Sequence, residues 1–293
     1  MAYTSVPSAL SGPARRWTPL CLTAVDHELV VGTGRPTPED QEYFADLLRS
    51  YGMRSLVTGA SPPSASFADL VTSALPAIDR HSGRVDLAVL CGTTPDSRPG
   101  FPMCNLSDAL AYPLMAFAVL DQGVVTPFTA LHVVASMVAT GAASRAVLIV
   151  VDQALRQHDG HVPEWMRARH NSVATLTLEP ADGAKAIFTD TSHGVLPADA
   201  PMLVERQMKE NASGWDTVIL GHGLARLPGS PQEARGVVTA APGLPCTGVW
   251  AALHRRLGEA ASAGQRIFVA DYDEVHRRLS SCTIQAPTTE AAC

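Results

Sequence analysis

Positive charge and aromatic side chains are scarce in this sequence. Its 293 residues include 22 Lys and Arg against 28 Asp and Glu, which gives a formal net charge of −6, and aromatic residues make up only 5%. Lysine is rare, and Lys and Arg form no basic run. A nucleic-acid-binding surface depends on clustered positive charge. The composition therefore excludes nucleic acid as a partner.

Long hydrophobic runs are also absent. No stretch reaches the roughly 18 consecutive apolar residues that a membrane-spanning helix needs. The first 17 residues, MAYTSVPSALSGPARRW, lack the apolar core of a secretory signal peptide. We therefore expect a soluble, cytoplasmic protein that does not contact a membrane.

Paired cysteines are missing as well. The six cysteines form no Cys-x-x-Cys pair, and their scatter argues against a zinc knuckle and against a disulfide framework. Most are expected to be buried as small apolar residues. They are Cys21, Cys91, Cys104, Cys246, Cys282 and Cys293.

Apolar residues, by contrast, make up 46% of the chain, and the mean hydropathy is +0.09. This amount provides a large core and excludes intrinsic disorder, which results from low hydrophobicity with high net charge. The length exceeds the roughly 100–200 residues of a typical domain. We therefore expect one large domain or two fused halves.

Strands and helices are expected to alternate in the first half. Residues 20–31 predict a β-hairpin, because polar residues interrupt the apolar runs. Thr37 followed by Pro38 predicts a helix start, and the apolar runs have the length of strands buried on both faces. The helix at 126–140 is apolar on nearly every face, which predicts a central position. The elements expected are helices at 37–51, 67–81, 105–114 and 126–140, and strands at 85–91, 115–120 and 146–151.

The second half is expected to repeat this order in a shorter form. Two antiparallel strands joined by a turn at 182–183 come first, and strands and helices alternate after them. Such alternation is typical of an α/β protein with a parallel sheet. The elements expected are strands at 172–178, 184–189, 217–220, 266–270 and 281–285, and helices at 200–211 and 247–257.

The ordered set of motifs resembles the β-ketoacyl-ACP synthase III branch of the thiolase superfamily over about residues 20–285. The motifs are the strand 85–91, the loop 93–102, the strand around Phe117, the helix 130–141, the strand 146–151, Ile-Leu-Gly-His-Gly at 219–223 and Pro-Gly-Leu-Pro-Cys-Thr-Gly at 242–248. The resemblance implies a thiolase-like αβαβα sandwich of two pseudo-repeated halves. A loose leader over 1–19 would precede an N-terminal half over 20–180 and an abbreviated C-terminal half over 181–293.

The catalytic triad implied by the resemblance is broken in this sequence. Such enzymes acylate a Cys at the start of the central helix, and a His and an Asn donate hydrogen bonds to the oxyanion. The Cys position falls on Val124, which cannot be acylated, and the Asn position falls on Cys246. Only His222 matches, and residues 271–276 replace the Gly-rich turn. No catalytic residue set is intact, and the resemblance implies neither a cofactor nor a metal.

Several residues have both a functional and a structural interpretation. His222 is an oxyanion donor or a vestigial core histidine, and we favour the second because no nucleophile faces it. Cys246 is a new partner for His222 or, as we favour, a buried apolar residue. Thr126 is favoured as a helix cap over a replacement nucleophile. A solvated loop is favoured over a metal site for His158, His161 and His170 with Asp152.

The resemblance also predicts a pocket and an interface. In such proteins central strands pair across a two-fold axis to form dimers, and the loop at 93–104 would contribute to the partner's pocket. Trp250 would fill the acyl pocket. The residues predicted at this pocket or interface are Pro102, Met103, Cys104, Phe117 and Trp250.

The sequence thus predicts the non-catalytic subunit of a heterodimeric acyl-thioester condensing enzyme or acyltransferase of fatty-acid-like secondary metabolism. It resembles the Cys-less subunit of the alkylquinolone synthase and the paired subunits of head-to-head condensing enzymes. Acyl-CoA or acyl-ACP thioesters would be the substrates, and an active ketoacyl synthase III-like subunit the partner. The alternatives are an autonomous acyltransferase using His222 and Cys246, an acyl-chain binding protein, and a homodimer in place of the heterodimer.

Overall fold

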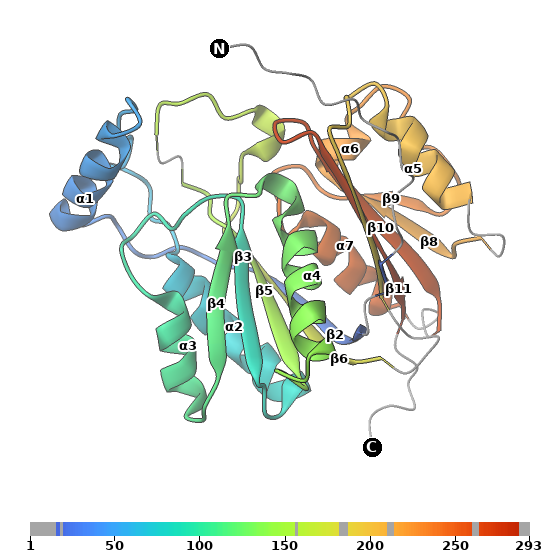
Figure 1. Ribbon diagram of the computed structural model, residues 1–293. Coiled ribbons are helices and arrows are strands. Elements are labelled where there is room, and N and C mark those ends of the chain that lie inside the picture. Colours follow the sequence, from blue (N-terminus) through green and yellow to red (C-terminus); the bar gives the residue numbers. More distant parts are fainter. Residues whose placement is uncertain are drawn as a thin grey trace, which may run out of the picture.

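The computed structural model describes residues 16–17, 20–155, 158–181, 187–209, 214–259 and 264–286. Its elements form five layers, with two β-sheets separated by a central pair of helices (Figure 1). Helices α2 and α3 cover the outer face of the first sheet, and α5 and α6 cover that of the second (Figure 1). The predicted αβαβα sandwich is therefore confirmed.

The helices keep the order that the sequence predicts. The central pair is α4 and α7, and the 3₁₀ turn η1 leads directly into α4. Their bounds are α1 Pro38–Arg49, α2 Phe67–Ser82, α3 Pro102–Leu110, η1 Gly123–Val125, α4 Thr126–Ala139, η2 Glu164–Met166, α5 Ala200–Lys209, α6 His222–Ala225 and α7 Gly248–Leu257.

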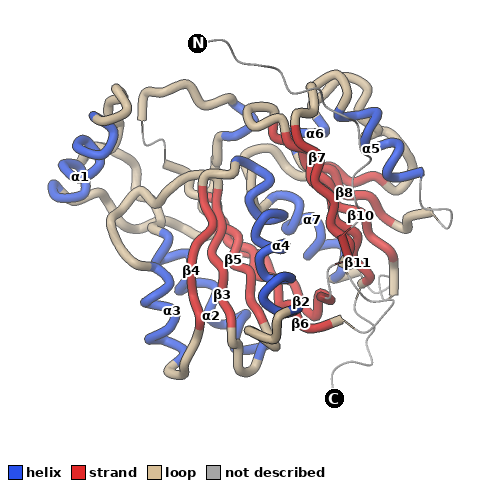
Figure 2. Tube along the Cα trace, viewed as in Figure 1, coloured by secondary structure: helices blue, strands red, loops and turns tan. Residues whose placement is uncertain are grey.

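The two sheets have the same strand order, which shows the pseudo-repeat directly. The first runs β4-β3-β5-β6-β2 and the second β9-β8-β10-β11-β7, with the short β1 added beside β7. Figure 2 shows helix α4 between the strands of the two sheets. Strand β5 of the first sheet pairs in parallel with β3 and antiparallel with β6. Strand β10 of the second sheet pairs in the same way with β8 and β11. The strands are β1 Arg16–Trp17, β2 Leu20–Leu29, β3 Leu87–Gly92, β4 Met115–Leu120, β5 Ala146–Asp152, β6 Ser172–Pro180, β7 Phe188–His193, β8 Thr217–Leu220, β9 Val237–Thr239, β10 Arg266–Asp273 and β11 Arg278–Gln285.

Local sequence signals account for the helix starts in the first half. Thr37 caps α1 with a capping box, in which its hydroxyl accepts from the Asp40 N–H and the Asp40 carboxylate accepts from the Thr37 N–H. Ser66 and Asp69 repeat the same arrangement at α2. The capped starts of both helices agree with the predictions to within a residue.

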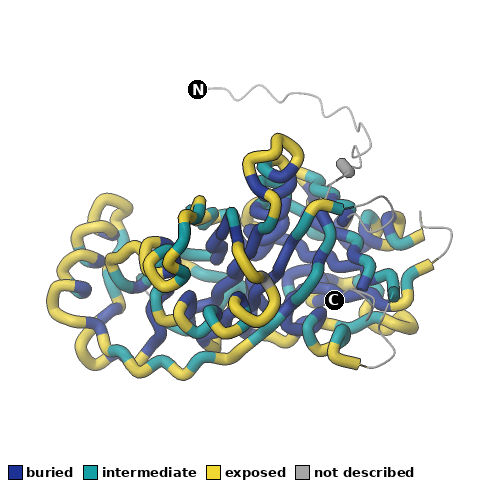
Figure 3. Tube along the Cα trace, turned by 90° about the horizontal axis from the view of Figure 1, so that it is seen from below, coloured by how far each residue is buried: buried dark blue, intermediate teal, exposed yellow. Residues whose placement is uncertain are grey.

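The largest apolar cluster lies between the two sheets. It joins inner-face residues of both sheets to α4 and α7, and Phe128 of α4 packs on Trp250 of α7 with ring centroids 5.6 Å apart. Figure 3 shows the buried residues through the middle of the molecule and the exposed ones around its rim. The central position predicted for the apolar helix is confirmed.

Three strand predictions are wrong. Residues 20–29 form one strand with a bulge, because Asp26 reaches sideways to Arg80 and His81 of α2 and forms no turn. Strands β6 and β7 lie in different sheets, because each completes the pairing of its own half. Strand β4 is only partly buried, because it is the edge strand of the first sheet.

Some predicted segments fall outside the described residues. These include the turn at 182–183, the helix end at 210–211 and most of the leader over 1–19, of which Arg16–Trp17 pair with β7. Helix α3 begins at Pro102, three residues before the predicted start, because Pro at the first helical position is favourable. Among the described residues, no helix is long and apolar enough to span a membrane.

Candidate functional site

The start of α4 is the position where the sequence predicts a missing nucleophile. Val124 lies there in the turn η1, and its side chain is 2% exposed. Its backbone N–H donates to Asp273 Oδ2 at 3.0 Å. A Cβ on Gly123, which has φ of +65°, would lie 1.7 Å from the same oxygen. A carboxylate of the chain itself therefore occupies the positive end of the central helix.

Asp273 is the last residue of β10, in the other half of the molecule, and its side chain is fully buried. Its Oδ1 accepts from the backbone N–H of His276 at 2.8 Å and lies 3.0 Å from the imidazole Nδ1. Arg278 donates to Gln122 Oε1 at 2.6 Å and to Thr129 Oγ1 at 2.9 Å. Residues at both ends of the β10–β11 turn, Asp273 and Arg278, thus hydrogen-bond to the beginning of α4.

Thr126 is not the helix cap that the sequence predicts. It is already helical and fully buried, and its hydroxyl donates to the carbonyl of Gly123 at 2.6 Å. A capping residue needs extended backbone before the helix, whereas the turn η1 runs straight into α4. Because its proton is already held and its side chain is inaccessible, Thr126 does not have the features of a nucleophile either.

His222 is positioned by the two glycines that flank it. A Cβ on Gly221 would lie 1.9 Å from Asp271 Cγ, and one on Gly223 would lie 2.2 Å from the carbonyl of Tyr272. Asp271 Oδ1 accepts from the N–H groups of Leu224 and Tyr272 at 3.1 and 2.8 Å. The two glycines therefore leave room at the start of α6 for the Asp271 carboxyl group and the Tyr272 carbonyl.

The electrostatics of these two residues differ. Burial raises the pKa of Asp271 to about 8, so the group keeps its proton at neutral pH. Burial lowers the pKa of His222, and the charges of Arg226 and Arg169 add to the effect, so the imidazole is neutral. None of the described residues hydrogen-bonds to the His222 ring. A neutral imidazole without a partner retains a hydrogen bond to donate.

Cys246 is a buried thiol at the start of α7. Its backbone N–H lies 3.1 Å from Asp152 Oδ1, and Thr247 donates to Asp152 Oδ2 from its N–H at 2.8 Å and its hydroxyl at 2.7 Å. The side chain of Cys246 is 1% exposed. Burial, followed by the charge of Asp152, raises the pKa of its thiol well above the usual value. These features disfavour Cys246 as a nucleophile.

Asp152 and Asp273 are equivalent by the pseudo-repeat. Each ends the fourth strand of its half, and each accepts N–H groups at the start of the central helix of the other half. The sequence interpretation missed both roles, because it treated Asp152 as a possible metal ligand and Asp273 as part of a lost glycine turn. The available signal was an acidic residue that ends an apolar strand.

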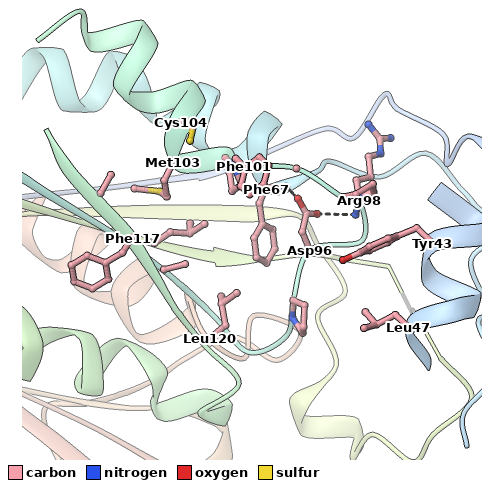
Figure 4. Close-up of a pocket in the computed structure, with 17 residues that line it drawn as sticks. Tyr43, Leu47, Phe67, Asp96, Arg98, Phe101, Met103, Cys104, Phe117 and Leu120 are labelled. Carbon is pink, nitrogen blue, oxygen red and sulfur yellow. Dashed lines mark hydrogen bonds between the residues drawn. The ribbon is translucent and has the colours of Figure 1, made fainter. Parts of the chain in front are cut away.

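A cavity of about 390 Å³ lies between α1, the loop before α3 and the edge strand β4. Its lining is mainly apolar; Tyr43 and Leu47 of α1 are on one side, and Phe101 and Met103 on the other (Figure 4). Four of the five predicted pocket or interface residues line it, namely Pro102, Met103, Cys104 and Phe117. Trp250 lies apart from it, fully buried between the central helices, and its indole N–H has no partner among the described residues.

The histidines weighed as metal ligands do not converge. His158 accepts from the Gly160 N–H within its loop, whereas Asp152 is in the interior at α7. In the part of the chain that the structure describes, no three His, Cys, Asp or Glu side chains gather in a way that would hold a metal ion.

The fold is shared with known condensing enzymes. A 3-oxoacyl-(acyl-carrier protein) synthase from Burkholderia xenovorans superposes with a TM-score of 0.61 at 14% identity, covering 94% of this chain and 96% of that one. AbyA1, a tetronic acid condensing enzyme, matches at 0.61 and 15% identity over 91% and 99% of the two chains. An OleA variant from Xanthomonas campestris matches at 0.61 and 13% identity over 92% and 98%.

No family model and no curated protein matches the sequence significantly. The structural similarity shows that the chain has the thiolase-like fold of ketoacyl synthase III and OleA-type enzymes.

Proposed function

We propose that this chain is a ketoacyl synthase III-like subunit without a nucleophile of its own, which completes a dimer with a catalytically active subunit. The observation that carries the proposal is the start of α4. Val124 replaces the reactive side chain there, and the Asp273 carboxylate takes the N–H that would stabilise a thiolate. A second negative charge at this buried position would be repelled. The arrangement supports a structural role for this centre.

The surface offered to a partner is the edge of the first sheet. Among the described strands, β4 pairs with β3 alone, so its outer edge presents unpaired backbone groups. Met115 at its start is 48% exposed, and Phe101 in the preceding loop is 80% exposed. Large exposed apolar side chains beside an open edge are typical of an interface. In this proposal β4 pairs with the partner's edge strand, and Phe101 reaches toward the partner's pocket.

The proposed substrates are acyl-CoA or acyl-ACP thioesters, condensed or transferred on the active subunit in fatty-acid-like secondary metabolism. This chain would shape the acyl tunnel with the loop at 93–104. The first test is co-expression with a synthase that keeps Cys, His and Asn, followed by size-exclusion chromatography and intact-mass analysis with an acyl-CoA. A 1:1 complex acylated only on the partner supports the proposal. A homodimer that itself gains an acyl group overturns it.

Matched variants sharpen the interface test. Met115→Lys on β4 is expected to abolish the complex, because it places an unpaired charge within the contact. Met202→Lys on α5 is the control, since Met202 is 63% exposed on the opposite side of the fold. If both variants lose the partner equally, or if both keep it, β4 is not the interface strand.

The cavity favours a second candidate function, an acyl-chain binding protein. Its volume of about 390 Å³ falls within the range of small-molecule sites. This function predicts that the protein alone binds dodecanoyl-CoA in calorimetry without turnover, and that Ala118→Trp, which fills the cavity, abolishes binding. An autonomous acyltransferase predicts turnover that Cys246→Ala abolishes, and the burial of that thiol disfavours it.

A further inference from the structure

Four polar side chains from four parts of the fold form a continuous hydrogen-bonded chain. His27 Nε2 on β2 lies 2.9 Å from Ser172 Oγ on β6. Ser172 Oγ lies 3.0 Å from Thr247 Oγ1, before α7. Thr247 Oγ1 donates to Asp152 Oδ2, at the end of β5, over 2.7 Å. The chain thus connects the outermost strand of the first sheet to the interior between the two halves.

The two ends of the chain have different access to solvent. Ser172 and Thr247 are completely buried and Asp152 is 1% exposed. His27 is half-buried and lines a groove of about 100 Å³ beside α2. Its Nδ1 has no hydrogen-bond partner among the described residues. Of the four residues, His27 is the one with access to solvent, so a proton from solvent enters the chain there.

The charge of Asp152 dictates the direction of every hydrogen bond in the chain. An ionised carboxylate only accepts, so the Thr247 hydroxyl donates to it. Each hydroxyl has one proton, so Ser172 must then donate to Thr247, and His27 must donate to Ser172 from Nε2. The ionised state of Asp152 therefore fixes the Nε2–H tautomer of His27.

We propose that these residues form a proton relay whose direction reverses as a unit when Asp152 is protonated. A proton from solvent binds His27 Nδ1, and the Nε2 proton passes to Ser172. The Ser172 proton passes to Thr247, and the Thr247 proton passes to Asp152. One proton has entered, no charge is left on the hydroxyls, and His27 ends as the Nδ1–H tautomer. The relay does not depend on the proposed subunit role.

The groups around Asp152 allow this change near neutral pH. The thiols of Cys91 on β3 and Cys246 face it, and Asp271 on β10 lies near Cys246; among the described residues no cation interacts with Asp152. Burial raises the pKa of Asp152 to about 6, although the hydrogen bonds from Thr247 and Cys246 oppose the rise. The Asp152 carboxylate thus gains a proton within a pH range in which proteins stay folded.

The groups around His27 keep it neutral over the same range. His254 and Arg255 of α7 face it, and Asp26 on its own strand is paired with Arg80 and His81. Burial lowers the pKa of His27 to about 4, and the two α7 side chains add to this effect. Between pH 5 and 8 the imidazole therefore changes its tautomer without becoming a stable cation.

Nitrogen NMR of the folded, full-length protein tests the relay. The two ring nitrogens of His27 have different ¹⁵N shifts in the two tautomers. From pH 8 to pH 5, the shifts are expected to exchange from the Nε2–H pattern to the Nδ1–H pattern, with a midpoint near 6. A His27 spectrum that keeps one tautomer throughout this range would overturn the proposal.

Variants show whether the hydroxyls transmit the change. Thr247→Val is expected to abolish the exchange at His27, whereas Thr247→Ser keeps a hydroxyl and is expected to retain it. Asp152→Asn is expected to hold His27 in one pattern at all pH values. An exchange that survives in Thr247→Val would overturn the relay. If Thr247→Val does not fold, Ser172→Ala interrupts the same chain and decides the question in the same way.

Discussion

Asp273 is expected to be a large contributor to the stability of the central layer. Its carboxylate accepts from Val124 at 3.0 Å and from His276 at 2.8 Å, and it is fully buried. In Asp273→Asn one carboxylate oxygen becomes an amide that donates. When the remaining oxygen faces His276, the amide faces the N–H of Val124, and two donors then meet in the interior.

The magnitude follows from two terms. A buried donor left unsatisfied costs about 1–3 kcal/mol, and a charge lost at a buried helix N-terminus costs about 1–2 kcal/mol. The two overlap, so we expect Asp273→Asn to lower the free energy of unfolding by about 2–4 kcal/mol. For a chain of this size, the melting temperature should fall by roughly 3–7 °C.

Urea unfolding followed by circular dichroism measures this loss. Asp108→Asn is the control, because Asp108 is exposed in the second half of α3 and its carboxylate has no hydrogen-bond partner among the described residues; its effect should stay within about 0.5 kcal/mol. Amide hydrogen exchange should show faster exchange at Val124 in Asp273→Asn. A loss below about 1 kcal/mol with unchanged exchange would refute the argument that the carboxylate stabilises the start of α4.

Three further predictions concern the same interior. Val124→Cys should react slowly with iodoacetamide, and adding Asp273→Asn should speed alkylation, because the thiolate no longer faces a carboxylate; equal rates would contradict this. Trp250→Phe should cost under about 2 kcal/mol in urea unfolding, because it removes a buried N–H without a partner, whereas Trp250→Ala should cost about 3–5 kcal/mol; similar losses would count against it. Because the pKa of Asp271 is raised to about 8 in the fold, the folded state keeps a proton there that the unfolded state loses, so the contribution of Asp271 to stability should fall from pH 4 to 8 by at most about 1.4 kcal/mol per pH unit. In Asp271→Asn the free energy of unfolding, measured from pH 4 to 8, should depend less on pH. An unchanged pH dependence would refute the raised pKa of Asp271.

Local patterns in the sequence determined most of the elements. The capping residues Thr37 and Ser66, the proline after Thr37 and the apolar runs of β3 and β5 act within a few residues, so their effect can be predicted without knowing the partner. The apolar surface of α4 on all sides implied a central layer, because such a helix must be covered all round. The interpretation of Val124 as the position of the nucleophile rests on the order of the sequence motifs and stays a prediction.

Tertiary structure alone decided how the halves are joined. Val124 and Asp273 are 149 positions apart, and Cys246 and Asp152 are 94 apart. No local pattern encodes such pairs, because a carboxylate at a strand end becomes a helix cap only when another half places unsatisfied N–H groups beside it. The same reason explains the error at β6 and β7. Two neighbouring strands with a short connection favour a hairpin locally, but each strand is stabilised by its own sheet. The sequence thus specified the individual helices and strands, and the packing of the two halves placed the Asp273 carboxylate at the start of α4.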